Sequence, residues 1–150
     1  MKQHGEHRIV VGVSGSKASI AALRWAAEQA RDRHARLDVV RAWEDPPARA
    51  PYATQCRVPE KAGAERADSE LRSILRTALG TPDAAVANAE VTHGLAARAL
   101  VDRCDGADML VLGAHMPADS VSPPVGPVIR ACLSRAPCPV VIVHAGDQAR

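Results

Sequence analysis

The chain has 150 residues and a formal net charge of +2 at pH 7; 47% of its residues are hydrophobic, but only 2% are aromatic and none is phenylalanine. Such a small net charge gives no strong attraction to nucleic acid or to a membrane surface, so we expect neither as a partner. The length is that of one domain over residues 1–150, with a core built from valine, leucine, isoleucine and alanine.

The first part of the chain alternates predicted strands and helices. After a polar tail over residues 1–7, the apolar run "RIVVGV", Arg8–Val13, predicts a buried strand. Apolar residues then recur at helical spacing over residues 16–33, and Ser16 is typical of a helix N-cap. The run "LDVVRAW", Leu37–Trp43, predicts the second strand.

A proline-rich loop over residues 44–58 follows the second strand. It is long for a compact domain, which suggests a lid. Pro59 suits the first turn of a helix, and this helix is predicted to end at Leu79, before Gly80. The segment over residues 84–94 predicts the third strand.

The last third of the chain continues the alternation. In order, it predicts a helix over residues 95–104, a strand over 107–114, a short helix over 125–136, a strand over 138–145 and a polar tail over 145–150. Leu95, Ala99 and Leu100 are expected to face inward from their helix.

This alternation predicts an α/β fold, a three-layer sandwich with a five-stranded parallel sheet, helices on both faces and right-handed crossovers. In such sheets, ligands bind beyond the carboxyl ends of the strands, where the strand order reverses. The loops over residues 14–19 and 113–126 are predicted to meet at that point.

Four cysteines, Cys56, Cys104, Cys132 and Cys138, form no C-x-x-C pair and no zinc-binding spacing. We therefore predict no metal site, and we expect Cys104 and Cys132 to be reduced packing residues. The sequence has no apolar run of about 18 residues, and its N-terminus lacks the apolar stretch of a signal peptide. We expect a cytoplasmic protein.

The segment "VSGSKAS", Val13–Ser19, resembles a phosphate-binding turn in composition but matches none of the common phosphate-binding or nucleophile motifs. It fails the Walker, dinucleotide and nucleophile-elbow patterns. It is similar to the S-G-G-x-D-S loop of the PP-loop ATP pyrophosphatases, with two changes. Ser16 replaces the second glycine of that motif, and Ala18 replaces its aspartate. We interpret it as a strand-to-helix turn with a capping serine and a solvated Lys17. The amides of Gly15 and Ser16 remain candidate anion donors.

Three segments together resemble the universal stress protein family, from Arg8 to Val143. They are "RIVVGVSGSKASIAALRWAAEQA", "HGLAARALVDRCDGADMLVLG" and "APCPVVIV". The resemblance implies the adenine nucleotide alpha hydrolase-like fold and a stress-response role, and it does not imply hydrolysis.

Family members that bind ATP carry a loop of glycine, two residues, glycine, nine residues, glycine and then Ser or Thr. Here Gly113 and Gly126 keep the first and last glycines, whereas Met116 replaces the middle one and Pro127 replaces Ser or Thr. A left-handed backbone at methionine costs about 1–2 kcal/mol, and proline offers neither an N–H nor a hydroxyl to a phosphate. Those members also tend to have aspartate where this chain has Ser14. The resemblance therefore implies weak or absent ATP binding.

The sequence thus favours a non-enzymatic stress-response binding module, with no catalytic or metal residue and with ATP or another adenine nucleotide as the candidate ligand. The alternative is a nucleotide-binding switch. The candidate binding positions are Gly12, Ser14, Gly15, Ala42, Leu112, Gly113, His115, Met116, Gly126, Pro127 and Val128. By resemblance, we expect a homodimer through the last strand, residues 139–144, and an unknown protein partner.

Overall fold

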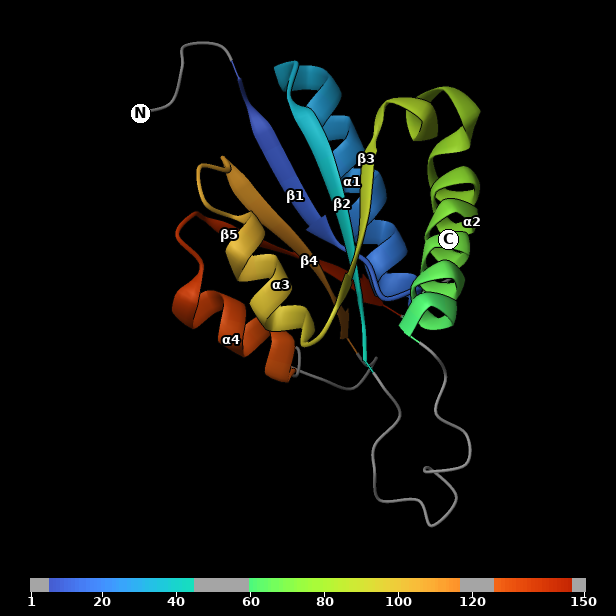
Figure 1. The fold of residues 1–150 in the computed structure, drawn as a ribbon. Coiled ribbons are helices and arrows are strands. Elements are labelled where there is room, and N and C mark those ends of the chain that lie inside the picture. The colour runs from blue at the N-terminus through green and yellow to red at the C-terminus, as the bar shows by residue number, and fades with distance from the viewer. Residues whose placement is uncertain (1–5, 45–59, 117–125, 147–150) are drawn as a thin grey trace.

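The computed structural model of the chain describes residues 6–44, 60–116 and 126–146. The elements are β1 (Arg8–Gly12), α1 (Lys17–Arg33), β2 (Arg36–Trp43), α2 (Glu60–Val86), β3 (Asn88–His93), α3 (Ala96–Arg103), β4 (Met109–Met116), α4 (Pro127–Arg135) and β5 (Val140–Gly146) (Figure 1). The strands form one parallel sheet in the order β3-β2-β1-β4-β5. The predicted α/β class and the five-stranded parallel sheet are confirmed.

Helices cover both faces of the sheet, as Figure 1 shows. On one face, Ile9 and Val11 of β1 pack with Leu23 of α1 and Leu71 of α2 in one buried cluster. On the other face, Val10 belongs to a second cluster with residues of α3 and α4. Because β1 is buried on both faces, its sequence is a continuous apolar run and not an alternating one.

The strand order reverses between β1 and β4, which are neighbours in the sheet although α1, β2, α2, β3 and α3 separate them along the chain. The register places Val11 opposite Val111. β1 and β4 therefore run toward the same edge of the sheet. Residues 14–19 follow β1 at this edge, residues 113–116 belong to β4, and residues 117–125 lie outside the described residues, so the meeting of the two loops stays a prediction.

The helix after residue 60 is longer than predicted. It was expected to end at Leu79, but helical backbone resumes beyond a kink at Gly80, whose φ is 75°, and continues to Val86. The prediction of strand from residue 84 is therefore wrong, and β3 begins at Asn88. The physical reason lies in the sequence after the kink, because Pro82 is well suited to the first turn of a new helical segment.

Two further expectations about the second half of the chain need correction. Leu95 is 64% exposed and does not face inward, because it occupies the N-cap of α3 and precedes the first helical turn. Ala99 and Leu100 are buried as predicted. The fourth strand begins at Met109, two residues later than expected, since the chain first turns through Gly106 with a φ of 76°.

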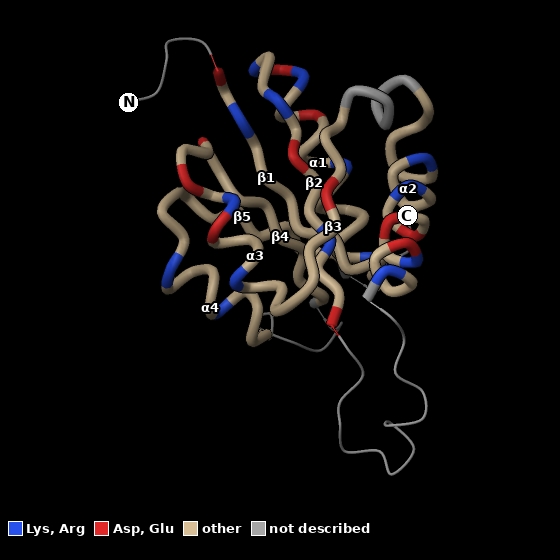
Figure 2. The backbone as a smooth tube through the Cα atoms, viewed as in Figure 1, with Lys and Arg blue, Asp and Glu red and all other residues tan. Residues whose placement is uncertain are grey.

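Charged residues lie mostly outside the two buried clusters. Figure 2 shows basic and acidic residues interspersed along α1 and α2, while the middles of the strands are largely uncharged. Asp38 of β2 is the exception among the described residues, since it is charged and only 3% exposed. In the described part of the chain, every helix is too short or too polar to cross a membrane. The predicted lid over residues 44–58 lies outside the described residues, apart from Glu44.

Candidate functional site

The turn between β1 and α1 is a capped helix start. Ser16 has an extended backbone, with φ −69° and ψ 158°, and its Oγ accepts a hydrogen bond from the amide of Ser19 at 3.2 Å. This is the N-cap predicted from the sequence. The cap satisfies one of the amides that a helix N-terminus leaves without an intrahelical partner.

Further hydrogen bonds lie within this turn. The Gly15 amide donates to Ser19 Oγ at 3.1 Å, and that hydroxyl donates to the Ser16 carbonyl at 2.9 Å. Ser14 Oγ donates to Ser16 Oγ at 3.1 Å. Gly15 has a φ of +89°, a conformation that favours glycine. An incoming phosphate would have to break the Gly15–Ser19 bond before it could use the Gly15 amide.

Gly113 lies where β4 passes beneath the start of α1. A Cβ atom at this position would overlap the backbone of Ala18 and come within 2.7 Å of the Ser19 amide nitrogen. The backbones of α1 and β4 can therefore approach this closely only because residue 113 has no side chain. Gly113 has a packing role here that is independent of any bound phosphate.

A cavity of about 200 Å³ opens at the edge where β1 and β4 end. Its lining includes the predicted positions Gly12, Ser14, Ala42, Leu112, Gly113 and Val128. It also includes residues that the sequence did not single out, namely Val13, Ser19, Val40, Ala96, Leu100 and Ile129. The side chains of the lining are apolar apart from the hydroxyls of Ser14 and Ser19.

The other predicted positions lie outside the cavity lining. Gly15 belongs to the turn, and Gly126 is the N-cap of α4 with an ordinary extended backbone, φ −68° and ψ 168°. Pro127 is in the first turn of α4 as expected, so it presents no N–H at this helix start. His115 is exposed on β4, and the backbone of Met116 ends β4 opposite Gly146.

Arg41 lies on the other side of the β1–α1 turn from the cavity. Its Nη2 donates to Glu70 Oε2 at 2.6 Å, while its buried Nε and Nη1 have no hydrogen-bond partner among the described residues. A Cβ on Gly15 would lie 3.6 Å from Arg41 Nη1. The guanidinium therefore places a positive charge, partly balanced by Glu70, beside the turn.

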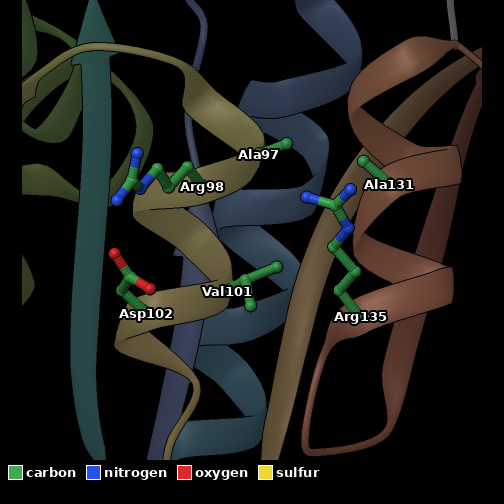
Figure 3. A pocket seen from close by; sticks show the side chains of 6 residues that line it. All are labelled: Ala97, Arg98, Val101, Asp102, Ala131 and Arg135. Atoms are coloured by element: carbon green, nitrogen blue, oxygen red, sulfur yellow. The ribbon is translucent and has the colours of Figure 1, made fainter.

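A second cavity, of about 280 Å³, lies between α3 and α4 and is lined only by residues of these two helices. Figure 3 shows Ala97 and Val101 pointing from α3 toward α4, with Arg135 extending from α4. No strand contributes to it. The second cavity thus lacks residues from the ends of β1 and β4, the reversal point where sheets of this class bind ligands.

Comparison with known proteins bears on both the fold and the family. The model of the universal stress protein family matches residues 6–144. A universal stress protein of Mycolicibacterium smegmatis is 30% identical over 151 residues, which cover 96% of this chain and 50% of that protein. The chain thus spans about half the length of this curated relative.

Solved structures of the same family share the fold. Universal stress protein UspA from Lactobacillus plantarum superposes with a TM-score of 0.68 at 21% identity, covering 93% of this chain and 99% of that one. A universal stress protein from Archaeoglobus fulgidus, in complex with dAMP, gives 0.57 at 23% identity, covering 91% and 97%. With the family model matching residues 6–144, from before β1 into β5, this chain belongs to the universal stress protein family.

Proposed function

We propose that this chain is a non-enzymatic binding module of the stress response, whose cavity at the β1–β4 edge holds the nucleoside part of an adenine nucleotide. The observation that carries the proposal is the apolar cavity at the point where the strand order reverses. A relative with the same fold was solved in complex with dAMP, which supports this choice of ligand class.

The size and lining of the cavity suit the base better than the phosphates. At about 200 Å³ it is smaller than the roughly 300–1,000 Å³ of pockets that enclose drug-sized ligands. Its apolar side chains, such as Val40, Leu100 and Leu112, favour a flat, weakly polar group. In this proposal the base enters the cavity and the phosphates extend toward the β1–α1 turn and the start of α4.

Two features at these helix starts lower the affinity for a triphosphate. The Gly15 amide is already bonded to Ser19 Oγ, and Pro127 presents no N–H. Each hydrogen bond to a charged group is worth about 1.5–3 kcal/mol, so losing two of them lowers affinity by about a hundredfold or more. We therefore propose weak ATP binding, in the millimolar range, and not a switch controlled by triphosphate.

The cavity chemistry supports binding without catalysis. None of its described lining residues carries an ionisable side chain, and its polar side chains are those of Ser14 and Ser19. General acid–base catalysis uses a titratable group within hydrogen-bond reach of the reacting atoms. Cys104, Cys132 and Cys138 are free thiols, which agrees with the cytoplasmic location that we include in the proposal.

Filling the cavity tests the proposal. We expect saturable binding of adenosine to the unchanged chain by isothermal titration calorimetry, and loss of that binding in Ala42→Leu, which adds volume to the cavity wall. The matched control is Ala97→Leu, which adds the same volume to the cavity between α3 and α4 and should leave binding unchanged. Urea unfolding checks that both variants fold. Equal binding by Ala42→Leu and the unchanged chain would contradict the proposed site.

We also propose that two copies of the chain associate through β5. This strand is at the edge of the sheet, with Val141, Ile142 and Val143 only half-buried in the single chain. An unpaired edge of β-branched residues favours pairing with another strand. Sedimentation equilibrium at micromolar concentration should give a dimer, whereas a monomer with β5 amides protected from hydrogen exchange would argue against this interface.

A further inference from the structure

Small apolar side chains give the cavity between α3 and α4 its apolar surface. Ala97 and Val101 of α3 and Ala131 of α4 belong to its lining, and the volume left between the two helices is about 280 Å³. Ala97 and Val101 also pack against the buried cluster beneath these helices. An apolar group placed in this cavity would therefore leave water for a surface continuous with the core.

Arg135 brings a positive charge to this apolar surface. Figure 3 shows its side chain extending from α4 toward Ala97 and Val101. Within residues 6–44, 60–116 and 126–146, Arg135 has no hydrogen bond or ion pair. The helix that carries it, with the sequence PVIRACLSR, contains no acidic residue. The charge of this guanidinium is thus uncompensated in the part of the chain that the structure describes.

The other two charged residues of the lining offset each other. Arg98 and Asp102 are four positions apart on α3, where opposite charges are neighbours on a helix surface. Figure 3 shows both side chains leaving α3 on the side away from α4. The carboxylate of Asp102 is therefore turned away from Arg135, and the lining as a whole keeps one positive charge.

We propose that the cavity between α3 and α4 binds a small organic carboxylate with a flat apolar body. The body covers Ala97, Val101 and Ala131, and the carboxylate accepts hydrogen bonds from the guanidinium of Arg135. Arginine suits this role because its planar N–H groups match the two oxygens of a carboxylate.

The dimensions of the cavity favour a small molecule over a peptide. Its lining runs over one helical turn, from residue 97 to 102 and from 131 to 135, which is about 6 Å of each helix. A helical peptide bound in a groove uses anchors from position i to i+7, a span of about 10 Å. The volume of about 280 Å³ is also at the lower end for ligand pockets. A body of one or two rings fits these limits.

A pair of probes of the same shape tests the charge requirement. We expect 1-naphthoate to bind saturably to the full chain in calorimetric titration, about tenfold more tightly than the neutral 1-naphthamide. In ¹⁵N-correlated NMR spectra, 1-naphthoate should shift the amide signals of residues 96–103 and 127–135. Equal affinity for the two probes, or no saturable binding of 1-naphthoate at millimolar concentration, would overturn the proposal.

Arginine variants separate ligand binding from a role at the helix end. Arg135→Gln should lower the affinity for 1-naphthoate about tenfold and leave that for 1-naphthamide unchanged. The matched control is Arg130→Gln, because Arg130 is an exposed arginine of the same helix outside the lining. Arg135 also lies in the last turn of α4, where a positive charge stabilises a helix. If Arg135→Gln lowers only the free energy of unfolding, this role alone accounts for the residue and the proposal is wrong.

Reciprocal alanine variants distinguish this site from the proposed adenosine site. Ala97→Leu should abolish binding of 1-naphthoate and keep that of adenosine, whereas Ala42→Leu should do the reverse. The two proposals can therefore fail separately. Binding of 1-naphthoate that is lost only in Ala42→Leu would place the probe in the other cavity and contradict this inference.

Sedimentation equilibrium of the same variants covers the remaining occupant, a second copy of the chain. We expect Ala97→Leu to sediment like the unchanged chain. A change in its association state would instead make the groove between α3 and α4 an interface between copies, and the proposal would be wrong. Should Ala97→Leu fail to fold, the comparison of Arg135→Gln with Arg130→Gln still decides.

Discussion

Replacing Gly113 with alanine is expected to lower the free energy of unfolding by about 3 kcal/mol. The added Cβ would overlap the backbone of Ala18 at the start of α1. A clash with a flexible side chain can be relieved by a rotamer change, but a clash with backbone requires α1 to move away from β4. The residues between them, such as Leu23 and Val111, are fully buried and lose contacts if it does.

The matched control is Gly126→Ala in the same loop motif. A Cβ at residue 126 meets nothing within 4 Å, and the backbone there is ordinary, so we expect a cost below about 1 kcal/mol. Urea denaturation followed by circular dichroism measures both values. Similar small costs at Gly113 and Gly126 would show that helix packing does not require a glycine at residue 113.

Replacing Asp38 with asparagine is expected to cost about 2–4 kcal/mol of unfolding free energy. Asp38 is 3% exposed and accepts hydrogen bonds from Arg8, Arg36 and Asn88 at 3.0–3.1 Å. Asparagine keeps the shape but removes the negative charge, which leaves the Arg8 side chain, only 19% exposed, beside a neutral group. The Arg36 side chain is 59% exposed and contributes less.

This effect should depend on pH in a defined direction. Burial by itself raises the pKa of Asp38, but the hydrogen bonds from Arg36, Asn88 and Arg8 outweigh it and hold the pKa below its ordinary value. A carboxyl with a lowered folded-state pKa contributes stability above its unfolded-state pKa of about 3.9, and this stability is lost as the pH falls toward the folded-state pKa.

Urea unfolding at a series of pH values checks this expectation. The difference between the unchanged chain and Asp38→Asn should be full near neutral pH and should shrink below about pH 4. The control is Asp68→Asn in the exposed pair with Arg72, for which we expect at most about 0.5 kcal/mol at any pH. A constant difference across the series would mean that the charge of Asp38 does not stabilise the fold.

The topology could be predicted because it depends on periodicity and on general rules of chain connection. Apolar runs such as Ile9–Val11 predict buried parallel strands, and helical segments between them fix the class. The predicted ends of helices and strands were less accurate where neighbouring residues favour different structures. Gly80 ends one helical segment but Pro82 starts another, so the helix continues into the predicted strand.

The candidate site could be predicted only in part. Gly12, Ser14 and Gly113 follow from the rule that ligands bind at the reversal point of the strand order, together with the family resemblance. Ser19 has a local signal, since a polar residue three positions after an N-cap often bonds back to the turn. The position of Arg41 beside the β1–α1 turn depends on tertiary packing, which sequence spacing does not specify.

Calorimetric titration of the chain with ATP and with adenosine, under identical conditions with magnesium, tests the central claim most directly. In this account the cavity binds the nucleoside, and the helix starts at Ser16 and Gly126 form no hydrogen bonds with the phosphates. The dissociation constants for ATP and for adenosine should then agree within about threefold. Functional phosphate contacts of about 1.5–3 kcal/mol each would instead make ATP bind about a hundredfold or more tightly than adenosine. That result would contradict the account.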